Sequence, residues 1–155
     1  MWASNRSPHS RAGRAQRGAG LVEVLVAVLV LSIGILGIAG LQARALKNNQ
    51  AAFDRSQAVM LSYFMLDAMR VNAEQAKAGA YDLSKTCTAL NDGSTLISND
   101  QEAWIQALKA ELGDRVSTCG EITCDSASCT VRVYWEDRNL EGDERFQMIE
   151  TTTRL

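Results

Sequence analysis

Four cysteines are the residues of this 155-residue chain whose spacing most directly suggests chemistry. They are Cys87, Cys119, Cys124 and Cys129, separated in turn by 31, 4 and 4 residues. A zinc site built on thiolates uses C-x2-C pairs, and no such pair is present, so the spacing favours two disulfides over a metal. Of the three possible connectivities we favour Cys124–Cys129 closing a turn, with Cys87–Cys119 fixing an earlier segment to a sheet. A Cys119–Cys124 bond is the open alternative.

A second candidate is an acidic stretch near the C-terminus. Asp137, Asn139 and Glu141, followed by Gly142, resemble the opening of a calcium-binding EF-hand loop. The twelfth position of such a loop needs a bidentate acid, but here it is Met148, and strands are predicted on both sides. We therefore expect a solvated acidic hairpin loop and no bound metal.

Nucleophilic catalysis has little support in the composition. The sole histidine, His9, lies in a basic N-terminal segment, which excludes Ser–His and Cys–His arrangements and most histidine-ligated zinc sites from the rest of the chain. No phosphate-binding loop or paired-carboxylate cleft stands out. We expect a protein that is not an enzyme and that needs no cofactor.

Charge is distributed unevenly along the chain. Residues 1–18 carry a net charge of +4, residues 19–79 of +1 and residues 80–155 of −7, against −2 for the whole chain. Nucleic-acid binding needs a positive surface, so the acidic C-terminal part argues against it.

Residues 19–41 form an apolar run with a single charge, Glu23. As a helix, 23 residues span about 35 Å, enough to cross a hydrocarbon core of about 30 Å. The basic block before the run predicts a cytoplasmic N-terminus and an exported C-terminal part, where disulfides form. The run is longer than the apolar region of a secretory signal peptide, which is one alternative. A plain single-pass anchor, with Glu23 reaching the membrane surface, is another.

The sequence around Glu23 resembles the class III signal of type IV prepilins. It reads RGAGLVEVLVA over residues 17–27. In that family a basic leader ends in glycine, prepilin peptidase cuts after it, and glutamate is the fifth residue of the mature chain. The resemblance implies cleavage between Gly18 and Ala19 and N-methylation of Ala19. The family usually has phenylalanine and threonine at the positions of Ala19 and Gly20.

The buried charge of Glu23 then has a partner. Cleavage creates an α-ammonium group at Ala19, and Glu23 of a neighbouring subunit can neutralise it in an apolar fibre core. Such a pairing would fix the register of assembly. We expect Glu23→Ala to leave processing intact and to impair incorporation.

A single long helix is predicted from about Leu21 to Lys77, ended by a glycine cap near Gly79. Gly34, Gly37 and Gly40 interrupt its apolar part at a spacing of three, which fits either close helix packing or a pliable segment. In the second half of this helix, apolar residues recur at helical spacing and are predicted to form the core. The charged residues Asp54, Arg55, Asp67 and Arg70 lie largely on other faces. The predicted core residues are Phe53, Met60, Leu61, Phe64, Ala68 and Val71, and the methionines Met60, Met65 and Met69 are also assigned to the core.

The remaining residues, 80–155, predict a small globular head. A helix capped at Asn99 runs through Trp104 to Leu112 and stops at Gly113. Strands are predicted over residues 130–135 and 145–153, with a third over 116–123. The predicted fold is α+β and pilin-like: a long N-terminal helix packs on a small antiparallel sheet that is cross-linked by disulfides. Its parts are a leader (1–18), a membrane or fibre-core helix (19–41), an amphipathic continuation (42–79) and a periplasmic head (80–155).

Among pilin-like proteins, the phrases VEVLVAVLVLSIGILGIAGLQARAL, DQEAWIQALKAEL and TVRVYWEDR look similar to minor pilins of the PilV kind, the type IV pilus modification proteins. The resemblance implies a low-abundance subunit that primes pilus assembly at or near the tip, and so acts in twitching motility and adhesion. Implied partners are other minor pilins, the major pilin, prepilin peptidase, the inner-membrane assembly platform and a tip adhesin. It implies a single-pass inner-membrane protein that later enters the surface fibre.

Three other functions stay open. A minor pseudopilin of a type II secretion system is built on the same helix, and genomic neighbours or a secretion assay would separate it. A DNA-uptake pilin is disfavoured by the −7 head. An anchored sensor with no fibre role predicts no processing at Gly18.

Overall fold

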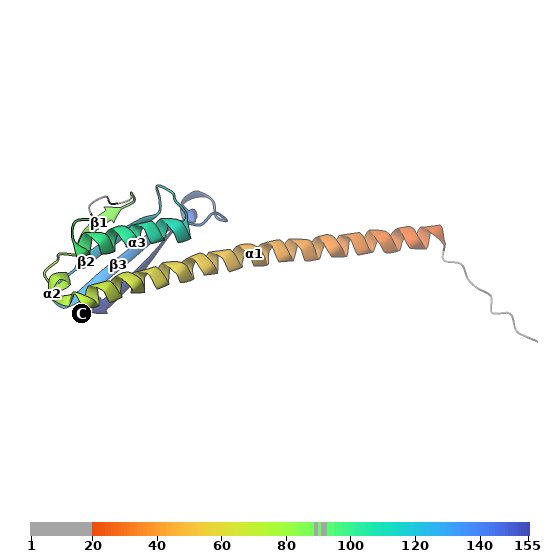
Figure 1. Cartoon of the computed structure of the whole chain (residues 1–155). Helices are drawn as coiled ribbons and strands as arrows, with labels where there is room; N and C mark the ends of the chain where they lie inside the picture. Colours follow the sequence, from red (N-terminus) through yellow and green to blue (C-terminus); the bar gives the residue numbers. More distant parts are fainter. Residues whose placement is uncertain (1–19, 89, 91–92) are drawn as a thin grey trace, which may run out of the picture. The chain divides into compact units, whose positions relative to one another are not determined.

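The structure, a computed structural model, describes residues 20–88, 90 and 93–155. The chain divides into an N-terminal unit, Met1–Gln42, and a C-terminal unit, Ala43–Leu155. Helix α1, Leu21–Val71, begins in the first unit and ends in the second (Figure 1). The predicted leader, Gly18 and Ala19 lie outside the described residues.

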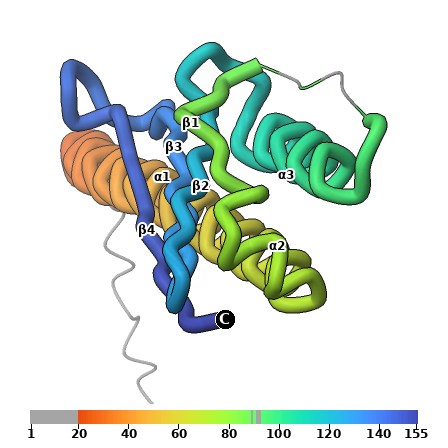
Figure 2. The backbone as a smooth tube through the Cα atoms, turned by 90° about the vertical axis from the view of Figure 1, so that its left-hand side faces the viewer, coloured from red at the N-terminus to blue at the C-terminus, as the bar shows by residue number. Residues whose placement is uncertain are grey.

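The C-terminal unit contains a four-stranded antiparallel sheet in the order β1-β2-β3-β4 (Figure 2). Its strands are β1 (Leu83–Thr86), β2 (Cys119–Cys124), β3 (Ser128–Glu136) and β4 (Phe146–Arg154). The other elements are α2 (Ala73–Lys77), α3 (Leu96–Leu112) and the 3-10 helix η1 (Gly142–Arg145). This arrangement confirms the predicted α+β, pilin-like fold.

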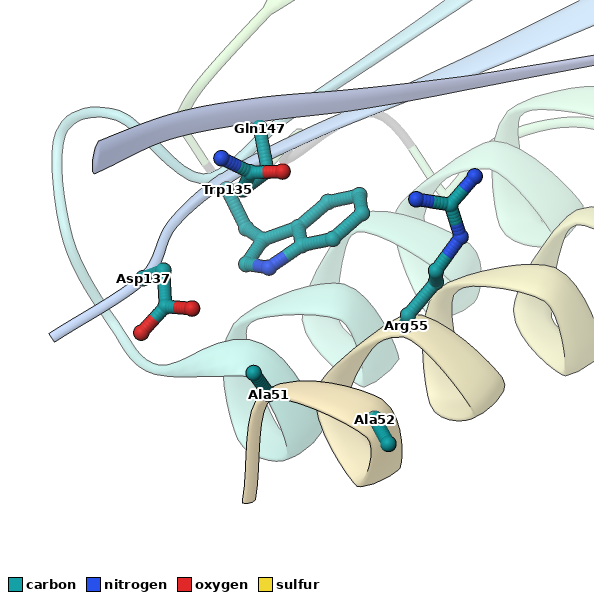
Figure 3. A pocket seen from close by; sticks show the side chains of 6 residues that line it. All are labelled: Ala51, Ala52, Arg55, Trp135, Asp137 and Gln147. Carbon is teal, nitrogen blue, oxygen red and sulfur yellow. The ribbon is translucent and has the colours of Figure 1, made fainter. Parts of the chain in front are cut away.

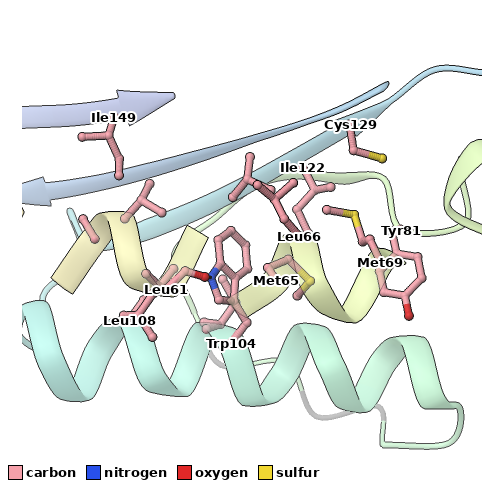
Figure 4. Close-up of a cluster of buried hydrophobic side chains, with 14 of the residues drawn as sticks. Leu61, Met65, Leu66, Met69, Tyr81, Trp104, Leu108, Ile122, Cys129 and Ile149 are labelled. Atoms are coloured by element: carbon pink, nitrogen blue, oxygen red, sulfur yellow. The ribbon is translucent and has the colours of Figure 1, made fainter. Parts of the chain in front are cut away.

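One face of the sheet is buried. Along β3, buried Val131, Val133 and Trp135 alternate with half-buried polar residues, because successive side chains of a strand point to opposite faces. Helices α1 and α3 contribute the opposing side of this core (Figure 4). The core residues drawn there come mainly from α1, α3, β2 and β3, and include Leu61, Met65, Leu66, Met69, Trp104, Leu108 and Ile122.

Trp104 of α3 joins both helices to the sheet. Its ring is fully buried, and its Nε1–H donates to the backbone oxygen of Leu61 in α1 at 3.0 Å. On the sheet side it lies against Gly120 of β2. A Cβ placed on Gly120 would lie 2.9 Å from Cδ1 of Ile105 and closer still to the Trp104 ring. Glycine at this position therefore lets α3 approach the sheet.

The buried face of α1 agrees only in part with the predicted one: Met65 and Met69 are buried as predicted. Phe53, Met60, Phe64 and Val71 are exposed, and only Leu61 of the predicted stripe is fully in the core, with Ala68 packed at its margin. The residues of α1 that are buried are Asp54, Ala58, Leu61, Ser62, Met65, Leu66 and Met69. The second half of α1 has two apolar faces, and periodicity identifies both without showing which one meets the sheet.

The long helix is not continuous to Lys77. It is interrupted at Asn72, whose φ of −119° and ψ of 46° are not helical and whose side chain approaches the Tyr81 hydroxyl at 3.5 Å. The predicted glycine cap is confirmed after α2. Gly79 has φ of 78°, its N–H donates to Ala76 O at 2.9 Å, and Ala80 N–H donates to Gln75 O at 2.9 Å, which is a Schellman motif.

Two predicted boundaries in the head need correction, and one strand was not predicted. Helix α3 begins at Leu96 rather than at Asn99, because Thr95 and Ser98 form a capping box. Its predicted stop at Gly113 is confirmed, with φ of 102°. Strand β2 begins at Cys119, so Val116 lies outside it and is 92% exposed. Strand β1 was not predicted, because its four residues show no apolar alternation and their pairing with β2 is irregular.

Both disulfides lie in the C-terminal unit and join the pairs favoured from the sequence. Cys87–Cys119 links the segment after β1 to the first residue of β2. Cys124–Cys129 links β2 to β3 at residues that are direct partners in the strand register. The cross-links therefore fasten a short edge strand and a hairpin to the centre of the sheet.

Candidate assembly surface

Glu23 lies in the first turn of α1. Its backbone N–H donates to Gly20 O at 2.9 Å, and its side chain is exposed in the isolated chain. A carboxylate at this end of a helix is favoured by the helix dipole. The predicted pairing with the Ala19 amine of another subunit involves a residue outside the described part, so it stays a prediction.

The described part of the N-terminal unit beyond Glu23 presents apolar side chains that are not covered by other described residues. All described residues from Gly20 to Gln42 are exposed. Within the described residues, α1 is the helix that is long and apolar enough to cross a membrane, by length and composition. Its N-terminal apolar part fits a membrane-anchored protein.

Gly34, Gly37 and Gly40 have no steric role toward the other described residues. A Cβ placed on any of them meets no atom within 4 Å beyond the local helix backbone. Each glycine weakens a helix by about 1 kcal/mol relative to alanine. If these glycines serve close packing, the partner is another molecule.

A second apolar surface continues along the part of α1 in the C-terminal unit. We call Phe53, Met60, Phe64 and Val71 the outer stripe; they are 56%, 56%, 51% and 88% exposed. Their spacing of seven, four and seven places them on one side of the helix. Large apolar side chains gathered in this way mark a contact surface rather than scattered surface residues.

The outer face of the sheet carries an ordered charge network. Arg132 lies between Glu121, at 2.9 Å, and Glu150, at 2.6 Å. The Tyr134 hydroxyl donates to Glu121 at 2.7 Å, and the Lys85 ammonium lies 3.9 Å from the centre of the Tyr134 ring. The hydrogen bond from Tyr134 and the interactions with Arg132 lower the pKa of Glu121. Part of the acidity of the head is thus compensated locally.

Glu136 forms a second such centre. It accepts hydrogen bonds from Ser117 at 3.1 Å and Arg115 at 3.2 Å, and Arg145 lies 3.3 Å away. These contacts lower the pKa of Glu136, the Ser117 hydrogen bond most. The carboxylate joins the segment before β2 to both ends of the β3–β4 connection.

Two acids that the sequence assigned to solvent are buried. Asp54 is 9% exposed and Asp137 is 6% exposed, so neither the predicted polar face of α1 nor the predicted solvated loop is correct at these positions. Burial raises the pKa of Asp54; Arg138 opposes this shift and Asp137 adds to it. Asp137 Oδ1 accepts the backbone N–H of Asn139 at 2.8 Å, which shapes the loop after β3.

Asp137 also borders a cavity of about 200 Å³ between α1 and the sheet (Figure 3). Ala51 and Arg55 of α1 line one side, and Trp135 and Gln147 of the sheet line the other. Periodicity could not reveal this cavity, because it depends on how the loop after β3 meets the helix. Among the described residues, no group of histidine, cysteine, aspartate and glutamate is arranged to hold a metal ion.

Comparison with known proteins gives one match. Residues 13–39 match the family model described as the prokaryotic N-terminal methylation motif. No curated protein and no solved structure matches the chain. The motif is type IV prepilin-like and implies processing by prepilin peptidase and use of pilus assembly machinery. Together with the fold, it supports a type IV pilin or pseudopilin.

Proposed function

We propose that this chain is a minor pilin that primes assembly of the type IV pilus and occupies a place at or near its tip. The observation that supports a fibre subunit is the pair of partner-free apolar surfaces on α1: the exposed residues 20–42 and the outer stripe. The first suits a bilayer before assembly, and both suit neighbouring helices in a fibre. The proposed role is structural and needs no cofactor.

Assembly on this proposal proceeds in three steps. Prepilin peptidase removes residues 1–18 and methylates the new terminus at Ala19. The helix then leaves the membrane and packs beside other helices, with Glu23 pairing with a neighbour's terminal amine. Burying two opposite charges together is far less costly than burying one, so the pair selects the correct register.

The head supplies the contacts that distinguish this subunit from others. Its net charge of −7 and its ordered network of Glu121, Arg132 and Glu150 suit polar contacts with other minor pilins or a tip adhesin. Electrostatic complementarity of this kind contributes to specificity and association rate more than to affinity. The minor rather than major role rests on the resemblance to PilV-like proteins.

The nearest alternative is a minor pseudopilin of a type II secretion system. It shares the helix and the processing signal, so the two proposals differ in which machinery needs the protein. We propose deleting the gene and measuring sheared surface pilin together with secreted exoproteins. Loss of piliation with normal secretion supports the minor pilin. Loss of secretion with normal piliation supports the pseudopilin.

Complementation then tests the role of Glu23. We expect wild type and Ser32→Ala, a polar change in the same apolar segment, to restore the phenotype. We expect Glu23→Ala to be processed but not incorporated. Normal incorporation of processed Glu23→Ala would contradict the pairing, and no phenotype in the deletion strain would contradict the fibre role.

A further inference from the structure

A larger cavity adjoins the one in Figure 3 and lies wholly within the C-terminal unit. Its volume is about 410 Å³. We call it the basic pocket. Arg44, Lys47 and Asn48 of α1 line one side, and Asp137, Asn139 and Gln147 line the other.

The cations of the basic pocket have no ion-pair partner among the described residues. In the part of the sequence that the structure describes, neither Arg44 nor Lys47 has a carboxylate within ion-pair distance. They are three residues apart on a helix and therefore neighbours on its surface. A guanidinium and an ammonium group on one wall, with side-chain amides nearby as donors, form a suitable environment for a phosphate group.

Asp137 adds the opposite charge on the facing wall. It is the acid that lines this pocket, and it is 6% exposed. Its Oδ1 accepts the Asn139 N–H at 2.8 Å, while no donor to Oδ2 is found among the described residues. A buried carboxylate is stabilised by a cationic partner. The pocket is thus suited to a ligand that carries both a phosphate and an ammonium group.

The position of the pocket close to the end of the apolar run indicates that such a ligand would come from the membrane. Arg44 is three residues after Leu41, the last residue of the apolar run. Three residues of chain span at most about 10 Å, so Arg44 lies within about 10 Å of Leu41 in any backbone conformation. The headgroup layer adjoining the hydrocarbon core is about 5–7 Å thick on each side. When residues 19–41 span a bilayer, Arg44 is therefore at the level of lipid phosphates.

We propose that the basic pocket binds the headgroup of a zwitterionic phospholipid, with Arg44 and Lys47 holding its phosphate and Asp137 its ammonium group. Bound lipid would hold the loop after β3 at the membrane surface until the subunit leaves the bilayer. This inference requires residues 19–41 to lie in a membrane and does not depend on which fibre the subunit joins.

The test uses the full chain in nonionic detergent micelles, with asparagine and glutamine side chains labelled with ¹⁵N. Dihexanoyl phosphatidylethanolamine is added, and dihexanoyl phosphatidylglycerol and inorganic phosphate are added in parallel samples. The readout is the amide signals of Asn139 and Gln147. The reference is the amide of Gln106, which is bonded to Glu102 in α3 and does not line the pocket. A residue-specific readout separates pocket binding from lipid association with the basic leader.

We expect saturable shifts of Asn139 and Gln147, and none of Gln106, with phosphatidylethanolamine. The double variant Arg44→Gln/Lys47→Gln should bind more weakly by a factor of about ten or more, which corresponds to a loss of about 1.4 kcal/mol or more. The control Lys77→Gln/Arg154→Gln removes two cations outside the pocket and should bind normally. Asp137→Asn should lose the preference for phosphatidylethanolamine over phosphatidylglycerol.

Three results would overturn the proposal. One is the absence of saturable shifts. Another is equal shifts with inorganic phosphate at the same concentration, which would indicate a general anion site. The third is unchanged binding by the Arg44→Gln/Lys47→Gln variant.

Discussion

The two parts of α1 differ in what covers them. Residues 43–71 bury one face, including Leu61 and Met65, against the sheet and α3 of the same chain. Residues 21–42 are all exposed in the described part of the chain, and apart from Glu23, Ser32 and Gln42 they are apolar or glycine. The head therefore supports only part of the helix that enters it. On the proposed function a membrane or other subunits cover the remaining apolar surface and the outer stripe, so we expect stability and assembly to depend on different residues.

The largest effect on stability is expected for Trp104→Ala. The ring is fully buried and bonded to Leu61 O, so its removal should lower the free energy of unfolding by about 3–5 kcal/mol. Urea denaturation followed by near-ultraviolet circular dichroism measures this change. Phe53→Ala, an exposed aromatic on α1, is the control and should change stability by no more than about 0.5 kcal/mol. Equal effects of the two substitutions would contradict the distinction between the buried core and the exposed surface of α1.

Loss of the disulfides should have the next largest effect, and an unequal one. Loop-closure entropy gives about 4 kcal/mol for Cys87–Cys119, which are 32 residues apart, and about 2 kcal/mol for Cys124–Cys129, which are 5 apart. We expect the double serine variants to follow this order in urea denaturation. The reverse order would show that the entropy of the unfolded chain is not the main source of the stability that the disulfides contribute.

A smaller effect of opposite sign is expected for Asp54→Asn. Because the folded-state pKa of Asp54 is raised, ionisation of this carboxyl disfavours the folded state. Its contribution is fully favourable below its ordinary pKa of 3.8 and is lost as the pH rises through the raised value. The variant should therefore melt at a higher temperature than wild type at pH 7, and the difference should shrink towards pH 3. A lower melting temperature at pH 7 would show that the charge of Asp54 is favourable in the fold.

Substitutions in the outer stripe are expected to have the smallest effect on stability and a large effect on assembly. Phe53→Ser/Phe64→Ser removes exposed rings, so the head should fold within about 1 kcal/mol of wild type. Incorporation into sheared fibres, measured by immunoblot, should fall several-fold. Ser56→Ala, an exposed change on the same helix, is the control. Normal incorporation of the double variant would exclude the outer stripe from assembly.

Sequence patterns predicted the elements better than their contacts. Gly113 and Gly79 end helices as expected, and alternation identified β3 and β4, because these signals act within a few residues. The buried face of α1 was predicted only in part, because both of its faces are apolar: Leu61, Met65 and Met69 are buried as expected, whereas the outer stripe is exposed. Strand β1 is too short and irregular to give a signal.

The candidate sites show the same limit. Glu23 and the cleavage position between Gly18 and Ala19 were predicted from a local sequence motif, and their roles stay predictions. Asp54, Asp137 and the basic pocket were missed, because they depend on a loop after β3 meeting a helix more than 80 residues earlier in the chain. Two acids separated by that distance gave no reason to expect burial at either position.

Intact-mass analysis of this chain in fibres sheared from the cell surface tests the central claim most directly. The account predicts a subunit that begins at Ala19, carries one added methyl group and contains both disulfides. Recovery of a chain that begins at Met1, or its absence from fibres and presence only in the membrane, would contradict the account.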